Sequence, residues 1–153
     1  MQSARQLYDG IYFDEPAMFI PWSLEEKDLL SSNFLWEVVN EKNHNYKLSG
    51  KINNEAIICN CYLYFLDGRL RSIRIHRNSG YFEGKEYISA KRQSFREIDQ
   101  FLVKNLGKPH LLGRLYSKLT EPSYTWETQA ITVKHSLYEH FGLDEELVIK
   151  IKR

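Results

Sequence analysis

Cysteine, proline and glycine are all scarce in this sequence, which holds two, four and eight of them among its 153 residues. Two cysteines are too few for a disulfide-rich scaffold. So few prolines and glycines, with no long polar tract, argue against a disordered or fibrous chain. No run of eighteen apolar residues occurs, so the sequence predicts no membrane-spanning helix. What these absences leave is an ordinary globular protein.

A secretory signal is missing too, because the first residues contain no apolar stretch. The two cysteines, Cys59 and Cys61, are only two positions apart, which is an awkward spacing for a disulfide within a strand. Both features favour a reducing, cytoplasmic setting, although a chain whose leader had been removed would look the same. The length predicts one domain over residues 1–153, large enough to bury one core.

Aromatic residues are abundant, at 14% of the chain, with ten tyrosines, eight phenylalanines and three tryptophans. Tyrosine is amphipathic, so this excess suits half-buried sheets and contact surfaces. The net charge is only +1, but it is unevenly spread. Residues 51–118 carry thirteen Lys and Arg against six Asp and Glu, whereas residues 1–50 carry four against eight. This polarity fits parts of one fold that attract each other, or a basic contact surface.

The N-terminal part predicts short elements. Residues 10–13 and 18–20 fit short strands, and Ser23 with Glu26 fits a capping box that begins a helix over 24–32. Residues 34–39 fit a strand or a helix. Three strands follow at 46–52, 56–65 and 69–77, separated by Asn53-Asn54 and by a turn around Asp67-Gly68.

Register can be chosen by asking which pairing gives one apolar face. A two-residue Asn53-Asn54 loop sets Leu48 against Cys59. A three-residue loop with Gly68 as the bulge residue sets Cys61 against Ile73, whereas a two-residue Asp67-Gly68 loop would set Cys61 against Arg74 and mix core with charge. The chosen register predicts a core face made of Tyr46, Leu48, Ile57, Cys59, Cys61, Leu63, Phe65, Ile73 and Ile75. The opposite face is basic and rich in tyrosine, with Lys47, Ser49, Lys51, Ile58, Asn60, Tyr62, Tyr64, Ser72, Arg74 and His76.

A long helix is predicted over 86–106, since an apolar stripe recurs at helical spacing and Gly107 then Pro109 form a stop. The stripe comprises Ile88, Phe95, Ile98, Leu102 and Leu106. Three more strands are expected at 123–127, 130–139 and 146–152, with Trp126 opposite Ile131 and Tyr124 opposite Val133. The fold class is therefore α+β, an antiparallel sheet of about six strands in a βββ-α-βββ order, with the long helix on one face and a short N-terminal β-α portion.

Candidate chemistry is sparse. Cys59 and Cys61 could share a metal, but their expected neighbours are apolar, so they fit small core residues and no metal or cofactor is predicted. The carboxylate pairs Glu25/Glu26 and Glu145/Glu146 are adjacent in sequence and therefore diverge, which fits a helix cap and solvent charge. No nucleophile or phosphate-loop motif occurs, so catalytic residues are not assigned.

The histidines show no chelating pattern. His135 and His140 are five apart and would point to opposite faces of a strand. His135 shares a face with apolar residues, so we expect a hydrogen-bonded core histidine. His44 and His110 fall in expected loops and have no partner at a recognisable spacing.

The basic tyrosine face is the best candidate binding site, through Lys47, Lys51, Tyr62, Tyr64, Arg74 and His76. Tyrosine and arginine are favoured at protein interfaces. A simply solvated face is the alternative, since antiparallel sheets often carry one. Nucleic acid is not the expected partner, because the chain is nearly neutral and would attract phosphates weakly.

The sequence thus favours a small, cytoplasmic, non-enzymatic protein-binding domain, for example one that neutralises a partner as an immunity protein or a chaperone does. An alternative is a small-ligand-binding or hydrolytic domain, with a cavity between sheet and helix lined by His135, Tyr124 and Trp126. The sequence leaves the oligomeric state and the identity of any partner open.

Overall fold

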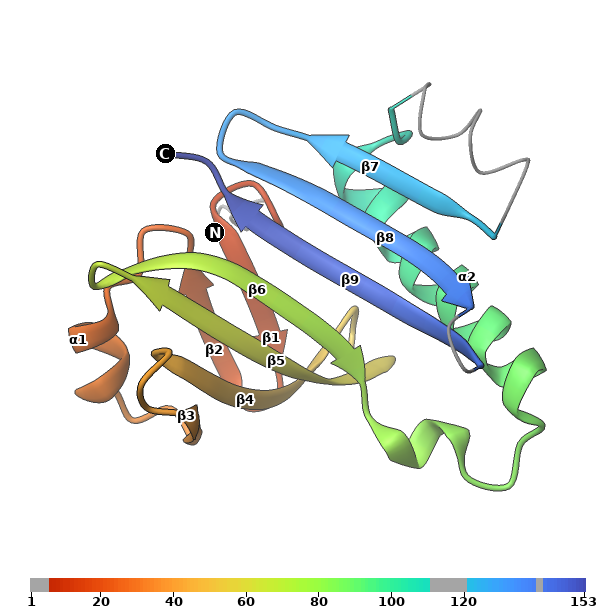
Figure 1. Cartoon of the computed structure of the whole chain (residues 1–153), viewed down its shortest axis with the longest axis horizontal. Helices are drawn as coiled ribbons and strands as arrows, with labels where there is room; N and C mark the ends of the chain where they lie inside the picture. The colour runs from red at the N-terminus through yellow and green to blue at the C-terminus, as the bar shows by residue number, and fades with distance from the viewer. Residues whose placement is uncertain (1–5, 111–120, 140–141) are drawn as a thin grey trace.

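The computed structural model describes residues 6–110, 121–139 and 142–153, and it has the expected α+β architecture (Figure 1). A seven-stranded antiparallel sheet runs in the order β3-β4-β5-β6-β9-β8-β7. Its strands are β3 (Trp36–Asn40), β4 (Asn45–Ile52), β5 (Ile57–Leu66), β6 (Arg69–Arg77), β9 (Leu143–Ile151), β8 (Ile131–Glu139) and β7 (Ser123–Glu127). The segment 34–39, ambiguous from sequence, thus supplies an edge strand. In the described part of the chain no helix is both long and apolar enough to cross a membrane.

The N-terminal part forms a separate two-stranded hairpin of β1 (Gly10–Asp14) and β2 (Ala17–Pro21), followed by α1 (Glu26–Leu30). The hairpin packs over β4, where Phe13 lies against the backbone of Gly50. A Cβ atom at Gly50 would be 2.4 Å from Cδ1 of Phe13, so only glycine allows this approach. The aromatic ring therefore fixes the hairpin on one face of the sheet.

The long helix α2 (Tyr87–Leu106) covers the same face of the sheet over β8 and β9, after a short 3-10 turn η1 (Ser79–Phe82). Glu86 caps it, because its carboxylate accepts hydrogen bonds from the backbone N–H groups of Ile88 and Ser89. Phe95 and Leu102 of the expected stripe are buried, but Ile88 is 51% exposed, so its place in the stripe was wrong. Ile88 lies in the first turn, which extends beyond the sheet, and Phe101 joins the buried side instead.

The two coverings leave the other face of the sheet open. In Figure 1 the β1–β2 hairpin and α2 both lie behind the sheet, and the viewer looks onto the uncovered side. All nine residues predicted for the core face of the central strands are buried. No described element packs over the opposite side, which we call the open face.

The capping box predicted at Ser23 is absent. Helix α1 begins at Glu26, and its capping residue Glu25 makes no side-chain cap. Backbone pairing decides this outcome: Leu24 accepts a hydrogen bond from the N–H of Leu70, and the Glu26 N–H donates to the carbonyl of Gly68. These bonds hold residues 24–26 extended beside β6, so the helix cannot start earlier.

Three predicted registers are wrong by two residues, and in each the core face is still right. Across β4 and β5, Leu48 lies opposite Cys61 instead of Cys59, because the connection spans residues 53–56. Asn53, Asn54 and Glu55 all have positive φ, whereas a type I′ two-residue loop needs positive φ only at its two central residues. Across β7 and β8, Trp126 lies opposite Val133 instead of Ile131.

The β5–β6 connection combines features of both predicted loops. Leu66 lies opposite Arg69, so Asp67-Gly68 forms the two-residue loop that the sequence argued against. A register shift then follows, since Phe65 pairs with Leu70 but Tyr64 pairs with Ser72. Arg71 is the extra residue of this bulge, and it restores the apolar face, setting Cys61 against Ile75 instead of Ile73.

Candidate functional site

The six residues predicted for binding all belong to the open face. Lys47, Tyr62 and Arg74 are direct cross-strand neighbours on β4, β5 and β6. Tyr64 lies two residues after Tyr62 on β5 and opposite Ser72. His76 lies two residues after Arg74 on β6 and opposite Asn60. The register errors left this grouping intact, because a shift of two residues keeps every side chain on its face.

Lys51 stands apart from this group. It lies opposite Ile58 near the corner of the sheet, and its ammonium is 3.1 Å from the carboxylate of Glu15 in the β1–β2 turn. Its charge is thereby partly compensated within the chain. Lys51 consequently contributes less to the open face than Lys47, which makes no ion pair with any described residue.

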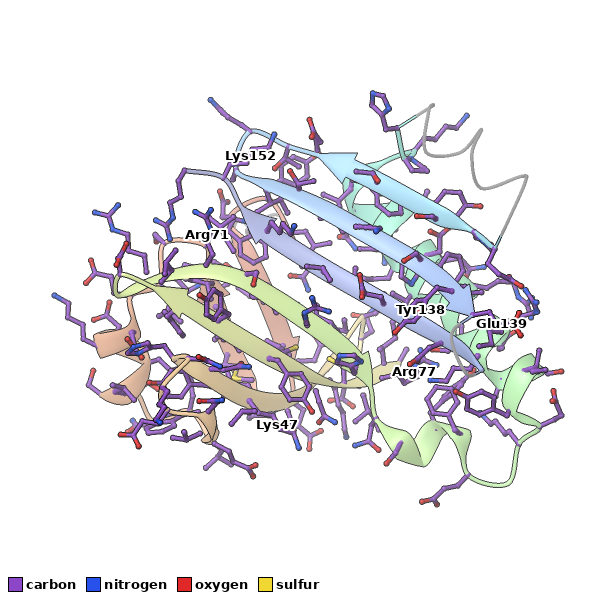
Figure 2. All side chains as sticks on the ribbon, in the orientation of Figure 1. Lys47, Arg71, Arg77, Tyr138, Glu139 and Lys152 are labelled. Carbon is purple, nitrogen blue, oxygen red and sulfur yellow. The ribbon has the colours of Figure 1, made fainter. Side chains whose placement is uncertain are left out.

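The open face is organised in rows that cross the whole sheet. The first row runs from edge to edge through Glu37, Lys47, Tyr62, Arg74, Val148, Lys134 and Thr125. The second runs through Asn45, Tyr64, Ser72, Lys150, Thr132 and Glu127. Figure 2 looks onto this face, with Lys47 labelled on β4 and Tyr138 on β8.

Positive and negative side chains occupy different strands in these two rows. Their inner strands carry four cations and no carboxylate: Lys47, Arg74, Lys134 and Lys150. The two carboxylates of the rows, Glu37 and Glu127, lie on the edge strands β3 and β7. Along these two rows the inner strands are therefore cationic and the edge strands acidic, and Glu146 of β9 lies on the same face beside them.

Lys134 and Lys150 are binding candidates that the sequence did not assign. They lie on β8 and β9, whose pairing with the central strands depends on the contact of β6 with β9. No turn joins those two strands, so no local signal fixes their register. The sequence showed that Lys150 alternates with the apolar Ile149 and Ile151. It did not show which strand Lys150 would lie beside.

A hollow of about 230 Å³ opens on the face around Val148, lined by Arg74, Thr125, Thr132, Lys134, Glu146, Val148 and Lys150. Arg74 lies 3.4 Å from the carboxylate of Glu146, with 57% of the arginine side chain exposed. Lys134 and Lys150 make no ion pair with any residue in the described ranges. The hollow is thus a polar depression in which two lysine ammonium groups have no described ion-pair partner.

His76 contributes an aromatic edge to the face. Its ring meets that of Tyr62 edge-on, with centroids 5.5 Å apart. Burial lowers the pKa of His76 below its ordinary value, and the nearby carboxylate of Asp144 opposes this shift only in part. His76 is therefore neutral at pH 7 and does not add to the positive charge.

The second candidate site is the histidine on the covered face. His135 is fully buried, and its Nε2 lies 2.5 Å from Oε2 of Glu145 on β9. Its Nδ1 lies 3.6 Å from Oδ1 of Asp99 on α2, an ion-pair distance rather than a hydrogen bond. The ring stacks on Phe95 with centroids 4.0 Å apart. The expectation of a hydrogen-bonded core histidine is confirmed.

Two carboxylates, Glu145 expected in solvent and Glu26 expected in a helix cap, have other specific partners. Glu145 has only 9% of its side chain exposed, and Ser94 Oγ donates to its second oxygen at 2.8 Å. Glu26 accepts hydrogen bonds from the Tyr46 hydroxyl at 2.5 Å and from His44 at 2.8 Å. Adjacent carboxylates diverge as expected, but one member of each pair turns inward because a strand neighbour or packed residue lies there.

Three residues, His135, Tyr124 and Trp126, are expected from the sequence to line a cavity between sheet and helix. His135 and Trp126 are buried, and the indole N–H of Trp126 donates to the carbonyl of Gly107 at 2.8 Å. Tyr124 lies opposite His135 and packs against Phe95. The side chain of His135 is 0% exposed.

The thiols of Cys59 and Cys61 are free and lie in the core, 3.9 Å apart. Their mutual hydrogen bond, followed by burial, raises the pKa of Cys61 well above its usual range, which leaves it unreactive. Among the described residues, no three His, Cys, Asp or Glu side chains gather as metal ligands. His140 lies outside the described residues.

No family model matches the chain, and comparisons with curated proteins and with solved structures likewise found no match.

Proposed function

We propose that this protein is a small, non-enzymatic protein-binding domain that contacts its partner through the open face of the seven-stranded sheet. The observation that carries the proposal is the one-sided covering of the sheet. The β1–β2 hairpin and α2 both pack on one face, so a tyrosine-rich surface with unpaired lysines stays exposed across several strands. Aromatic side chains beside arginine are typical of interface hot spots.

Tyr62 is the expected anchor of this interface. It lies between Lys47 and Arg74 in the first row and packs edge-on against His76. A half-buried tyrosine held by neighbours loses little conformational freedom on binding. The cations around it would steer an acidic partner and set the association rate.

The hydrolytic alternative is less well supported. His135 has two carboxylate neighbours, as catalytic histidines often do, but its side chain is fully buried. A general base must come within about 3.2 Å of the proton that it removes, and His135 cannot do so without an opening of the helix. This cluster fits a structural role between helix and sheet.

A cytoplasmic location and neutralisation of a partner, in the manner of an immunity protein or a chaperone, belong to the same proposal. The two free thiols in the core fit a reducing compartment. A broad sheet surface suits a protein that acts by covering a surface of its partner.

Affinity capture from the native host lysate tests the proposal. The wild-type chain is compared with a Tyr62→Ala/Arg74→Ala variant and with Tyr87→Ala/Arg96→Ala, which removes the same residue types from the exposed side of α2. We expect the wild type and the α2 variant to capture one specific protein that the open-face variant loses. Equal capture by all three, at equal thermal stability, would overturn the proposal.

A further inference from the structure

We infer that the hollow around Val148 receives the carboxylate side chains of an acidic segment of the protein partner. The inference rests on the proposed function and names the chemistry of the partner. Val148 has four neighbours on the open face. Arg74 and Lys134 flank it across the strands, and Glu146 and Lys150 lie two residues away along β9.

The charges around Val148 do not balance. Three of its four neighbours are cations, and the one carboxylate, Glu146, is engaged by Arg74 at 3.4 Å. Lys134 and Lys150 are diagonal neighbours on adjacent strands, since Lys134 lies opposite Val148 and Lys150 opposite Thr132. Like charges this close on a sheet repel each other. An anion between the two ammonium groups would relieve that repulsion.

The hollow also supplies hydrogen-bond donors. The hydroxyls of Thr125 and Thr132 line it beside the lysines. Val148 lies in the middle of this lining and is only 7% exposed. A volume of about 230 Å³ suits one or two carboxylate side chains.

The acidic edges favour a protein over a nucleic acid. A phosphate backbone that followed either row would meet Glu37 on β3 or Glu127 on β7. It would also gain little from a chain whose net charge is +1. A folded protein can present carboxylates to the centre of the face and cations to its edges. Charge complementarity therefore points to an acidic loop or helix of a protein.

The test uses backbone-amide NMR spectra of the whole chain at low ionic strength, titrated with blocked hexaglutamate. Hexaglutamine and a short oligothymidylate serve as comparison probes. We expect saturable shifts at Lys134, Val148 and Lys150 with hexaglutamate, none with hexaglutamine, and weaker binding of the oligothymidylate. Absent shifts, or tighter binding of the oligothymidylate at these residues, would overturn the inference.

Variants make the test specific. Lys134→Gln/Lys150→Gln is expected to weaken hexaglutamate binding about threefold to thirtyfold, as for two exposed charge contacts. The matched control is Lys104→Gln/Lys108→Gln, which removes two exposed lysines at and just after the end of α2 that form no ion pair with a described residue, and it is expected to change the affinity less than about twofold. Equal weakening by both variants would overturn the inference.

Failure of this inference and failure of the proposed function give different results. If the partner captured from the lysate is lost with Tyr62→Ala/Arg74→Ala but kept with Lys134→Gln/Lys150→Gln, the open face still binds and only the acidic hollow is refuted. If capture survives both variants, the proposed function fails as well.

Discussion

His135 is a titratable residue with no exposed surface. It sits between a helix carboxylate and a strand carboxylate while its ring packs on Phe95. Burial alone would lower the pKa of the imidazole, but the contacts with Asp99 and Glu145 outweigh it and raise the pKa above its ordinary value. Protonated His135 thus ties α2 to the sheet.

This arrangement predicts a pH-dependent stability with a definite sign. Because the folded pKa is raised, the stabilisation is complete below about pH 6.5, the unfolded value, and is lost as pH rises through the folded pKa. His135→Gln keeps a donor for Glu145 but cannot be protonated. We expect urea unfolding to show that the wild type loses about 1–3 kcal/mol more than the variant as the pH rises from 6 to 9. Parallel pH profiles of the two proteins would contradict this role.

Glu26 offers a second prediction, since its carboxylate binds Tyr46 and His44 instead of capping a helix. Burial and the bond to Glu26 raise the pKa of Tyr46 to about 12. Glu26→Ala should therefore lower the free energy of unfolding by about 1–2 kcal/mol, because a largely buried hydroxyl loses its acceptor. Ser23→Ala should change it by less than about 0.5 kcal/mol. Urea unfolding of both variants decides the matter, and a larger loss in Ser23→Ala would restore the capping box.

Sequence reasoning at this scale identified environments better than partners. The apolar neighbours of His135 along β8 predicted burial and a hydrogen bond. Asp99 could not be found in the same way, because its approach depends on how α2 lies against the sheet. Glu145 lay outside the predicted strand 146–152, whereas β9 begins at Leu143 and places Glu145 diagonally across from His135. Lone side chains reveal their face through periodicity, whereas contacts between distant elements leave no periodic trace.

Among the elements, the hairpins show how a fold can be predicted correctly with wrong pairings. A slip of two residues preserves the inside and outside of a strand, so the apolar pattern cannot detect it. Loop length decides the register, and here it depends on three consecutive residues at positive φ and on the bulge at Arg71. Glycine is the usual sequence signal for such backbone conformations. It is absent from the loop over residues 53–56 and from the bulge at Arg71, so neither feature could be recognised.

Docking of the β1–β2 hairpin gives a prediction at this scale. Gly50→Ala should lower the free energy of unfolding by about 1–3 kcal/mol, because the new Cβ would overlap the Phe13 ring. In a Phe13→Ala background the same change should cost far less, since the obstructing ring is gone. Thermodynamic coupling in this double-mutant cycle is the measurement. Ser49→Ala, on the exposed side of β4, is the control and should not couple to Phe13→Ala. Additive effects of Gly50→Ala and Phe13→Ala on the free energy of unfolding would refute the contact.

For the whole molecule, we propose that function follows from the covering of only one face of the sheet. Both covering elements lie on one face of the sheet, so the other offers rows of polar and aromatic side chains on a rigid support. The central part of that face was predicted from three strands contiguous in sequence. Its extension onto β9 and β8 was not, because the β6–β9 pairing joins strands separated by the whole of α2.

Site-specific photo-crosslinking in the native host tests the open face most directly. A photoreactive phenylalanine derivative replaces Tyr62 in one version of the chain and Tyr87, on the outer side of α2, in another. We expect one adduct of defined mass from position 62 and none from position 87. An absent adduct at position 62, or equal adducts from both positions, would contradict a partner-binding role for the open face.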